Sequence, residues 1–130
     1  MDFLIGHLIG DYLLQNDWMA RNKKKLTVEG AIACWIHCIL WTISVMFFTG
    51  WWKITMIDHG PRFQVGGLYL WIAVFFSHWI FDRTGICMWW MKITKKSGQE
   101  NPFFPLVYVA VDNTCHLVCL WLIQKYLIGA

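Results

Sequence analysis

The chain has few charged residues and no strong excess of either sign. Only 15% of its 130 residues are Asp, Glu, Lys or Arg, whereas 58% are hydrophobic and ten are tryptophan. An ordinary soluble domain carries about 25% charged residues. The formal net charge of +3 is modest and the basic residues flank apolar segments, so we expect no nucleic-acid partner. The composition predicts one small all-α integral membrane domain over residues 1–130.

The sequence also lacks a disulfide pattern, a cleavable leader, solenoid repeats and low-complexity tracts. Its five cysteines are odd in number and lie within apolar segments, which argues against a disulfide framework. Cys34 shares the helical face of His37, so a thiolate ligand is an alternative to the usual role of free cysteine as a small buried hydrophobe. Residues 1–18 lack a basic n-region and a small-residue cleavage pattern. We therefore expect them to be retained rather than removed as a signal peptide.

Four apolar segments predict a four-helix bundle with a polar interior. Thr27 is a plausible N-cap for the second helix, which should end at Thr49-Gly50, and Asn101 is a plausible cap for the fourth, with Pro102 in its first turn. A helix needs about 20 residues to cross a bilayer, so the first segment is short for a full span. The predicted helices are residues 3–18, 28–48, 67–91 and 102–127.

Basic residues predict how the bundle is oriented. Connections after the first and third segments hold Arg21, Lys23, Lys24, Lys25, Lys92, Lys95 and Lys96, against Lys53, Arg62 and Lys125 on the opposite side. Because cytoplasmic loops are enriched in Lys and Arg, both termini should face away from the cytoplasm.

Histidine and aspartate recur four residues apart inside these apolar segments. Three such pairs occur, the third in reversed order, and a further histidine lies alone in the second segment. Helical spacing places both members of each pair on one face. Histidine and carboxylate are ligands of zinc, manganese and iron, and ionisable groups within a bilayer are functional by default. The predicted metal ligands are His7, Asp11, His37, His78, Asp82, Asp112 and His116.

The depth of these residues favours a single site. Counted from the cytoplasmic ends, Asp11, Asp82 and Asp112 each lie about ten residues, or about 15 Å, into their helices, and the paired histidines lie about one turn deeper. The reversed order in the fourth segment suits its antiparallel direction. Gln15 continues the His7/Asp11 face and Asn113 adjoins Asp112, so either is expected to orient a ligand.

The charges favour two metal ions and hydrolytic chemistry. Three ionised aspartates would cost roughly 8 to 10 kcal/mol on membrane-insertion scales, and Arg83 is the only basic residue inside the predicted spans and away from their ends. Two divalent cations would balance the negative charge of the aspartates. They would share one carboxylate and keep coordination positions open for water. The predicted activity is metal-dependent hydrolysis of an ester or phosphoester in a lipid or membrane-adjacent substrate. Asp11, Asp82 and Asp112 are the candidate catalytic carboxylates, as bridge or general base.

Three other interpretations remain open. In the first the polar residues serve only as a structural network, and in the second they line the path of a proton or metal-ion transporter. In the third the protein is a phage-type interaction protein that alters the host envelope, with a purely structural metal site. His59, in the loop after the second segment, is expected only to be solvated. The small extramembrane mass leaves room for a homo-oligomer.

Motifs in all four segments resemble a known family. They are GHLIGDYLLQ at residues 6–15, DWM at 17–19 followed by lysines, His37, SHWIFDR at 77–83 and VDNTCH at 111–116. Together they resemble an uncharacterised family of small membrane proteins from bacteria and their phages, known only as a domain of unknown function. The chain is also broadly similar to predicted membrane-bound metal-dependent hydrolases. The resemblance implies residence in a bacterial inner membrane and names no activity.

Overall fold

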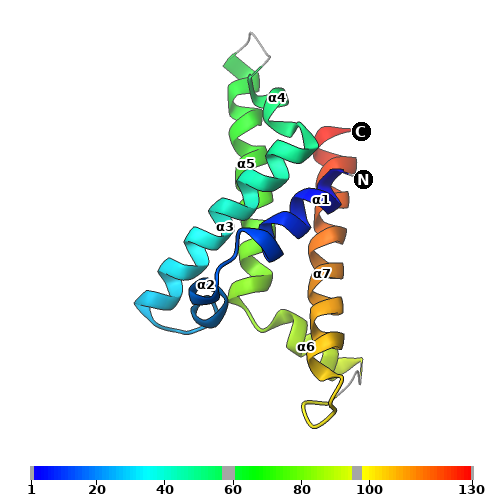
Figure 1. The fold of residues 1–130 in the computed structure, drawn as a ribbon. Helices are drawn as coiled ribbons and strands as arrows, with labels where there is room; N and C mark the ends of the chain where they lie inside the picture. Colours follow the sequence, from blue (N-terminus) through cyan, green and yellow to red (C-terminus); the bar gives the residue numbers. More distant parts are fainter. Residues whose placement is uncertain (1, 57–60, 95–97, 130) are drawn as a thin grey trace.

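The computed structural model describes residues 2–56, 61–94 and 98–129, and every element in these ranges is helical (Figure 1). His59 lies outside the described residues. The elements in chain order are α1 (Asp2–Leu8), the π-helix η1 (Ile9–Leu13), α2 (Asp17–Asn22), α3 (Val28–Thr49), α4 (Trp51–Met56), α5 (Pro61–Arg83), α6 (Ile86–Ile93), α7 (Phe104–Leu122) and the π-helix η2 (Ile123–Ile128).

The first predicted helix, residues 3–18, is not continuous. It divides into α1, η1 and, after a break at residues 14–16, the start of α2. Asn16 is the cause of the restart, because its side chain accepts a hydrogen bond from Met19 N at 2.9 Å and so caps α2. A short polar side chain at this position favours a new helix start over continuation.

The second predicted helix is confirmed as α3, with its caps. Thr27 accepts a hydrogen bond from Gly30 N at 3.1 Å, and the helix ends at Gly50, whose φ of 70° is left-handed. Glycine adopts that conformation without the steric cost that other residues meet.

The third predicted helix, 67–91, is also divided. α5 begins earlier, at Pro61, and ends at Arg83, and α6 begins at Ile86 after a break at Thr84-Gly85. Glycine is the poorest helix former after proline, which favours a break there. The fourth predicted helix begins at Phe104 rather than 102, because Asn101 instead caps the preceding turn by accepting from Phe103 N at 2.9 Å.

Four elements form a closed ring. α1 contacts α3, α3 contacts α5, α5 contacts α7, and α7 returns to contact α1. α3, α5 and α7 are the long members, and α1 lies between α3 and α7 (Figure 1). An apolar core occupies the end of the ring near α4 and consists of Trp41, Val45, Met46, Trp51, Leu70, Val74 and Leu120.

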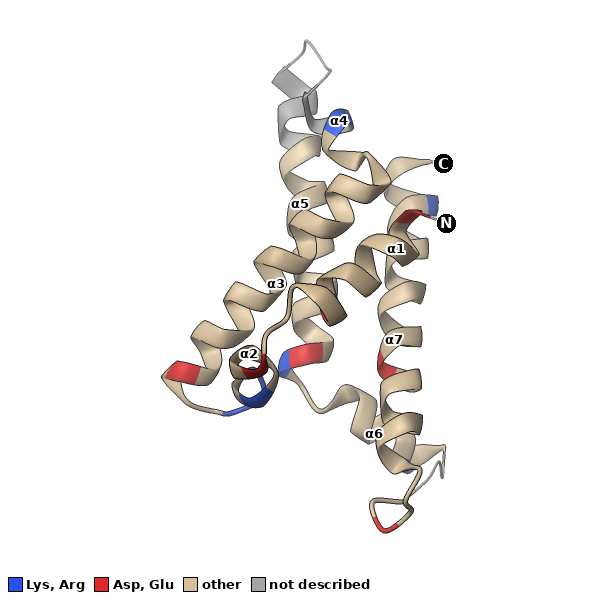
Figure 2. Cartoon of the chain, in the orientation of Figure 1, with Lys and Arg blue, Asp and Glu red and all other residues tan. Residues whose placement is uncertain are grey.

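Charged residues are concentrated at one level of the ring. Figure 2 shows Lys and Arg on α2 and the loop after it, with acidic residues at the adjoining end of α5 and midway along α7. Within the described residues, two stretches are long and apolar enough to cross a membrane, Val28–Thr49 and Phe104–Ile128.

Candidate metal centre

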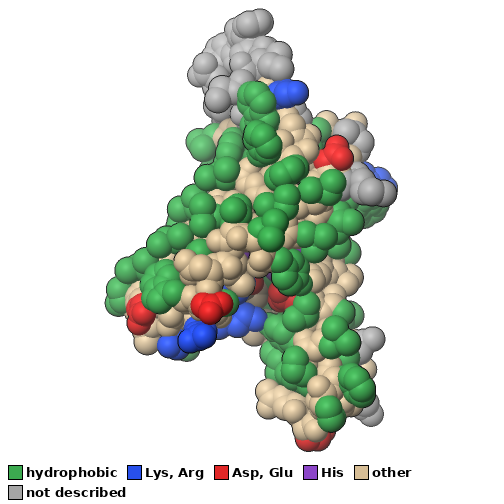
Figure 3. Space-filling view, in the orientation of Figure 1, with side chains coloured by type: hydrophobic (Ala, Val, Ile, Leu, Met, Phe, Trp, Pro, Cys, Tyr) green, Lys and Arg blue, Asp and Glu red, His purple; other side chains and the backbone are tan. Residues whose placement is uncertain are grey.

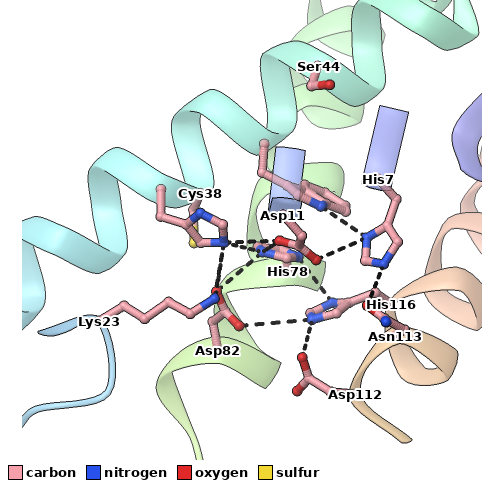
Figure 4. A network of polar contacts seen from close by, with 12 residues as sticks. His7, Asp11, Lys23, Cys38, Ser44, His78, Asp82, Asp112, Asn113 and His116 are labelled. Atoms are coloured by element: carbon pink, nitrogen blue, oxygen red, sulfur yellow. Dashed lines mark hydrogen bonds and ion pairs between the residues drawn. The ribbon is translucent and has the colours of Figure 1, made fainter. Parts of the chain in front are cut away.

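The structure brings all seven predicted ligands together inside the ring (Figure 4). α1 supplies His7, η1 supplies Asp11, α3 supplies His37, α5 supplies His78 and Asp82, and α7 supplies Asp112 and His116. The four histidines and Asp82 are at most 1% exposed, whereas Asp11 and Asp112 have side chains 12% and 17% exposed.

Two histidines and two aspartates converge on one point. The Nε2 atoms of His37 and His78 are 2.9 Å apart. Asp11 Oδ1 lies 3.2 Å from the first nitrogen and 3.4 Å from the second, and Asp82 Oδ2 lies 3.0 Å and 3.3 Å from them. Ligand atoms about 2.0 to 2.1 Å from a tetrahedral zinc ion are roughly 3.3 Å apart. These spacings fit donors to a divalent cation, and His37, His78 and Asp82 form one group whose ligand atoms all lie within 4.8 Å of one another.

A second group lies beside the first and shares Asp82. The other oxygen of that carboxylate, Oδ1, is 4.0 Å from His116 Nε2, which is 3.5 Å from Asp112 Oδ2. His78 joins the groups, since its Nδ1 is 3.1 Å from His116 Nδ1. One carboxylate with an oxygen toward each group is the arrangement of a bridging ligand.

Several donor atoms in these groups have no hydrogen-bond partner. Within the described part of the chain, Asp11 Oδ1, Asp82 Oδ1 and His116 Nε2 are buried and make no hydrogen bond of good geometry, although each lies at ion-pair distance from another member of the cluster. A buried polar atom without a hydrogen bond destabilises the fold. Acceptor atoms that lack a hydrogen-bond donor and lie in one cluster are therefore suited to binding a cation.

His7 is fixed by a chain of hydrogen bonds. Trp41 Nε1, which can only donate, lies 3.1 Å from His7 Nδ1. His7 Nε2 must then carry the proton, and it donates to Asn113 Oδ1 at 3.0 Å, while Asn113 Nδ2 donates to Tyr12 Oη at 2.8 Å. Asn113 therefore contacts and orients His7, but both ring nitrogens of His7 are engaged in hydrogen bonds, so in this arrangement neither offers a free lone pair to a metal ion.

Trp41 and Lys23 belong to the site, although no sequence pattern marks either of them as a member. Trp41 also stacks on His78, with ring centroids 4.0 Å apart. Lys23, expected only to mark the cytoplasmic side, reaches inward: its Nζ is 2.7 Å from Asp82 Oδ2 and 3.3 Å from His37 Nε2. A tight turn after α2 brings Lys23 there, and a lysine cluster beside an apolar segment does not reveal such a turn.

Arg83 holds the loop that carries Lys23. Its Nη1 donates to the backbone carbonyl oxygens of Lys23 at 3.1 Å and Lys25 at 2.6 Å. The adjacent Lys24 donates to the Tyr108 hydroxyl on α7. Burial alone would lower the pKa of Lys24, but this hydrogen bond and the nearby carboxylates raise it above its ordinary value.

Gln15 and the cysteines Cys34 and Cys38 lie outside the cluster, whereas Cys87 contacts one of its members. Gln15 falls in the break after η1, so it does not continue the His7/Asp11 face, and its buried Oε1 has no hydrogen-bond partner among the described residues. Cys34 and Cys38 contact each other, with sulfur atoms 3.9 Å apart. In the described ranges, no potential metal group includes a cysteine. Cys87 donates to Asp112 Oδ1 at 3.3 Å.

Comparison with known proteins yields a family relation. Neither the curated proteins nor the solved structures contain a match. One family model matches residues 1–129, so nearly the whole chain is covered. The predicted relation to an uncharacterised family is confirmed, and the chain belongs to the family described as "Protein of unknown function (DUF3307)".

Proposed function

We propose that the protein is a membrane-embedded metalloprotein that binds two divalent transition-metal ions, of zinc, manganese or iron, and hydrolyses an ester or phosphoester bond. The substrate would be a lipid or a molecule at the membrane surface. The observation that carries the proposal is the convergence of His37 Nε2, His78 Nε2, Asp11 Oδ1 and Asp82 Oδ2, with spacings of 2.9 to 3.4 Å between nitrogens and from each oxygen to both nitrogens.

The distribution of polar and apolar side chains supports the membrane location. Histidine and aspartate are buried, while large apolar side chains are exposed along α3, among them Trp35 (47%), Ile43 (49%) and Phe47 (65%). Monomeric soluble proteins rarely expose such continuous apolar surface. We place the domain as a helical bundle in the inner membrane of a bacterium, with both termini facing away from the cytoplasm, as the basic loops and the family resemblance predict.

Charge balance supports cations in the cluster. Among the described residues, Asp11, Asp82 and Asp112 have one ammonium group at ion-pair distance, that of Lys23 beside Asp82. Uncompensated carboxylates are expensive in an apolar interior. Divalent ions would supply the missing positive charge, and Asp82 is placed to bridge two of them.

Each residue would have a defined task in hydrolysis. Bound metal ions would lower the pKa of a coordinated water molecule and polarise the oxygen of the scissile bond. Asp112 is the most exposed carboxylate of the cluster and sits on its outer side, so it is the best placed to take a proton from water. Trp41 and Asn113 hold His7 in one tautomer and orientation, and the ring of helices excludes bulk water.

Access to the cluster would come from the basic side. In Figure 3 the surface is indented between the part formed by α2 and α3 and the part formed by α6 and α7, with basic and acidic side chains along its rim. A substrate held at the membrane surface could approach through this indentation.

Metal content is the deciding measurement. The protein would be purified in detergent without chelators, and metals per chain would be measured by mass spectrometry. The controls are His78→Ala, Asp112→Ala and the exposed Arg21→Gln. We expect about two equivalents of one metal, retained by Arg21→Gln and reduced in both ligand variants. Metal-loaded protein would then be screened on lipid esters and phosphoesters. A folded wild-type protein that takes up no zinc, manganese or iron would refute the proposal.

A proton path is the second candidate, and one observation favours it. His37, His78 and His116 are joined in sequence by nitrogen-to-nitrogen contacts of 2.9 and 3.1 Å, which is a chain along which protons can move. Proton flux into liposomes by metal-free protein, lost in His78→Ala, would support this alternative.

A further inference from the structure

Lys23 occupies an edge of the proposed metal centre. Its ammonium nitrogen lies 2.7 Å from Asp82 Oδ2 and 3.3 Å from His37 Nε2, and its side chain is 12% exposed. Both contact atoms belong to a group able to hold a metal ion. Lysine presents three donors and no acceptor, so it cannot be a ligand while protonated.

A divalent ion and this ammonium cannot share the same two ligand atoms. Both cations would sit within a few ångströms of each other in a poorly hydrated site, where repulsion is strong. The lone pair of His37 Nε2 can be directed to the metal or to the Lys23 donor, but not to both. Metal binding therefore requires the Lys23 side chain to turn away from Asp82.

The displaced ammonium would remain close to the centre but outside the ligand group. The backbone of Lys23 is held by Arg83 through its carbonyl oxygen at 3.1 Å, so the side chain moves while its Cα stays in place. The space open to it is the surface indentation of Figure 3, on the side where basic side chains gather. Arg83, which contacts the Lys23 backbone, and the adjacent Lys24 add positive charge next to Lys23. Residues 17–29 carry Arg21, Lys23, Lys24 and Lys25 against Asp17 and Glu29, so this segment keeps a net charge of +2. Such a segment attracts anions.

We propose that Lys23 is exchanged for metal in the centre and then binds the anionic group of the substrate, so that the substrate is a phosphate ester rather than a neutral ester. This inference rests on the proposed metal centre. Lys23 would pair with phosphate oxygens while the metal ions hold the others, as cations and metals do at phosphoryl groups.

The test is a pair of titrations on Lys23→Met, an apolar replacement of similar length. In the first, apo protein in maltoside detergent at pH 8 is titrated with zinc, and in the second, zinc-loaded protein is titrated with inorganic phosphate. We expect Lys23→Met to bind zinc about tenfold tighter and phosphate about tenfold weaker than wild type. Lys53→Met, the same change on exposed α4 at the far end of the ring, should alter neither affinity.

The opposite signs separate this role from damage to the fold, which would weaken both affinities. If wild type binds zinc and Lys23→Met does not bind it more tightly, or binds phosphate equally well, the inference is wrong while the metal centre stands. Failure of folded wild type to bind zinc, manganese or iron refutes the proposed function itself. A short-chain phosphatidic acid titrated in parallel identifies the source of the phosphate: tighter binding than inorganic phosphate indicates a lipid headgroup, and equal binding a soluble phosphoester.

Discussion

At the scale of single residues, neighbours of fixed hydrogen-bonding character set the state of His7. Trp41 can only donate, and it donates to Nδ1, which leaves Nε2–H to bond Asn113. The Asn113 amide is fixed in turn, because its NH₂ faces the Tyr12 hydroxyl. His7 is thus held in one tautomer by Trp41 and Asn113, which engage both of its ring nitrogens, and no carboxylate is needed to select that tautomer.

Removing Asn113 should cost more than removing the Tyr12 hydroxyl. Asn113→Ala leaves the buried His7 Nε2–H without an acceptor, at about 1 to 3 kcal/mol. Tyr12 is 55% exposed, so Tyr12→Phe should cost about 0.5 kcal/mol or less. Unfolding in mixed SDS micelles measures both free energies. Equal losses would contradict the donor chain that runs from Trp41 through His7 to Asn113.

The sequence predicted the members of the cluster because most of them occur as pairs with a recognisable helical spacing. His7/Asp11, His78/Asp82 and Asp112/His116 each form a one-turn pair that can be recognised without a structure. Trp41 and Lys23 carry no such signal. Their roles depend on how α3 faces α1 and on the turn between α2 and α3.

At the scale of elements, close packing of α1 and η1 on α3 sets the position of His7 and Asp11. A Cβ at Gly6 would lie 2.8 Å from Val45 Cα, and one at Gly10 would lie 2.5 Å from Trp41 Cδ1. Small residues four apart let helix backbones approach closely in membranes. The Ser44 hydroxyl fixes the same approach by donating to the Gly6 carbonyl oxygen at 2.8 Å.

Adding one methyl group at this contact should separate the two elements. Gly6→Ala and Gly10→Ala are each expected to destabilise the protein by about 1 to 3 kcal/mol and to reduce its zinc content, since Asp11 moves with the backbone. Gly85→Ala is the matched control, because nothing lies within 4 Å of its Cβ position. Unfolding in SDS and metal analysis would be compared for the three variants. A loss in Gly85→Ala as large as in the others would overturn this explanation.

Arg83 should control the mobility of the loop between α2 and α3. In Arg83→Gln the two carbonyl contacts at 3.1 and 2.6 Å are lost, so we expect backbone amides of residues 23–27 to exchange with deuterium about tenfold faster, as a lost local stabilisation of about 1.4 kcal/mol predicts. Arg21→Gln, an exposed change on α2, should leave exchange unaltered. Hydrogen–deuterium exchange measured by mass spectrometry tests this, and equal exchange in wild type and Arg83→Gln would contradict it.

The sequence predicted where helices occur better than it predicted where they are interrupted. Apolar runs and caps predicted α3 closely. The breaks at residues 14–16 and at Thr84-Gly85 fall at short polar stretches, residues 15–17 and 82–84, inside otherwise apolar segments. The mean hydropathy of a segment does not reveal that such a stretch interrupts the helix. The π-turns of η1 and η2 likewise have no marker in composition.

At the scale of the whole molecule, the apolar exterior and the concentration of basic residues at one end predict a defined orientation of the protein in the membrane. Alkaline phosphatase fused after residue 129 should be active, and a fluorescent protein fused there should be dark, because only the enzyme matures outside the cytoplasm in bacteria. Moving the positive charge, by changing Lys23, Lys24 and Lys25 to Gln together, should lower that activity. A fluorescent wild-type fusion would mean that the termini face the cytoplasm instead.

Metal should stabilise the folded bundle as a whole. An ion that binds only the folded state at 100 times its dissociation constant contributes about 2.7 kcal/mol. Thermal unfolding in detergent should therefore shift upward with zinc and return with chelator. Asp82→Asn, which alters the shared carboxylate, should show little shift, and a full shift in this variant would place the ion elsewhere.

The contact between α1 and α7 also affects the order in which the site assembles during synthesis. His7 meets Asn113 across 106 positions of the chain, and Asp112 and His116 arrive on the same late helix. During synthesis, Asp11, His37 and Asp82 are made before Asp112 and His116. The Lys23 ammonium, which pairs with Asp82, is translated early enough to accompany them. The proposed metal centre can therefore be completed only after α7 has been synthesised.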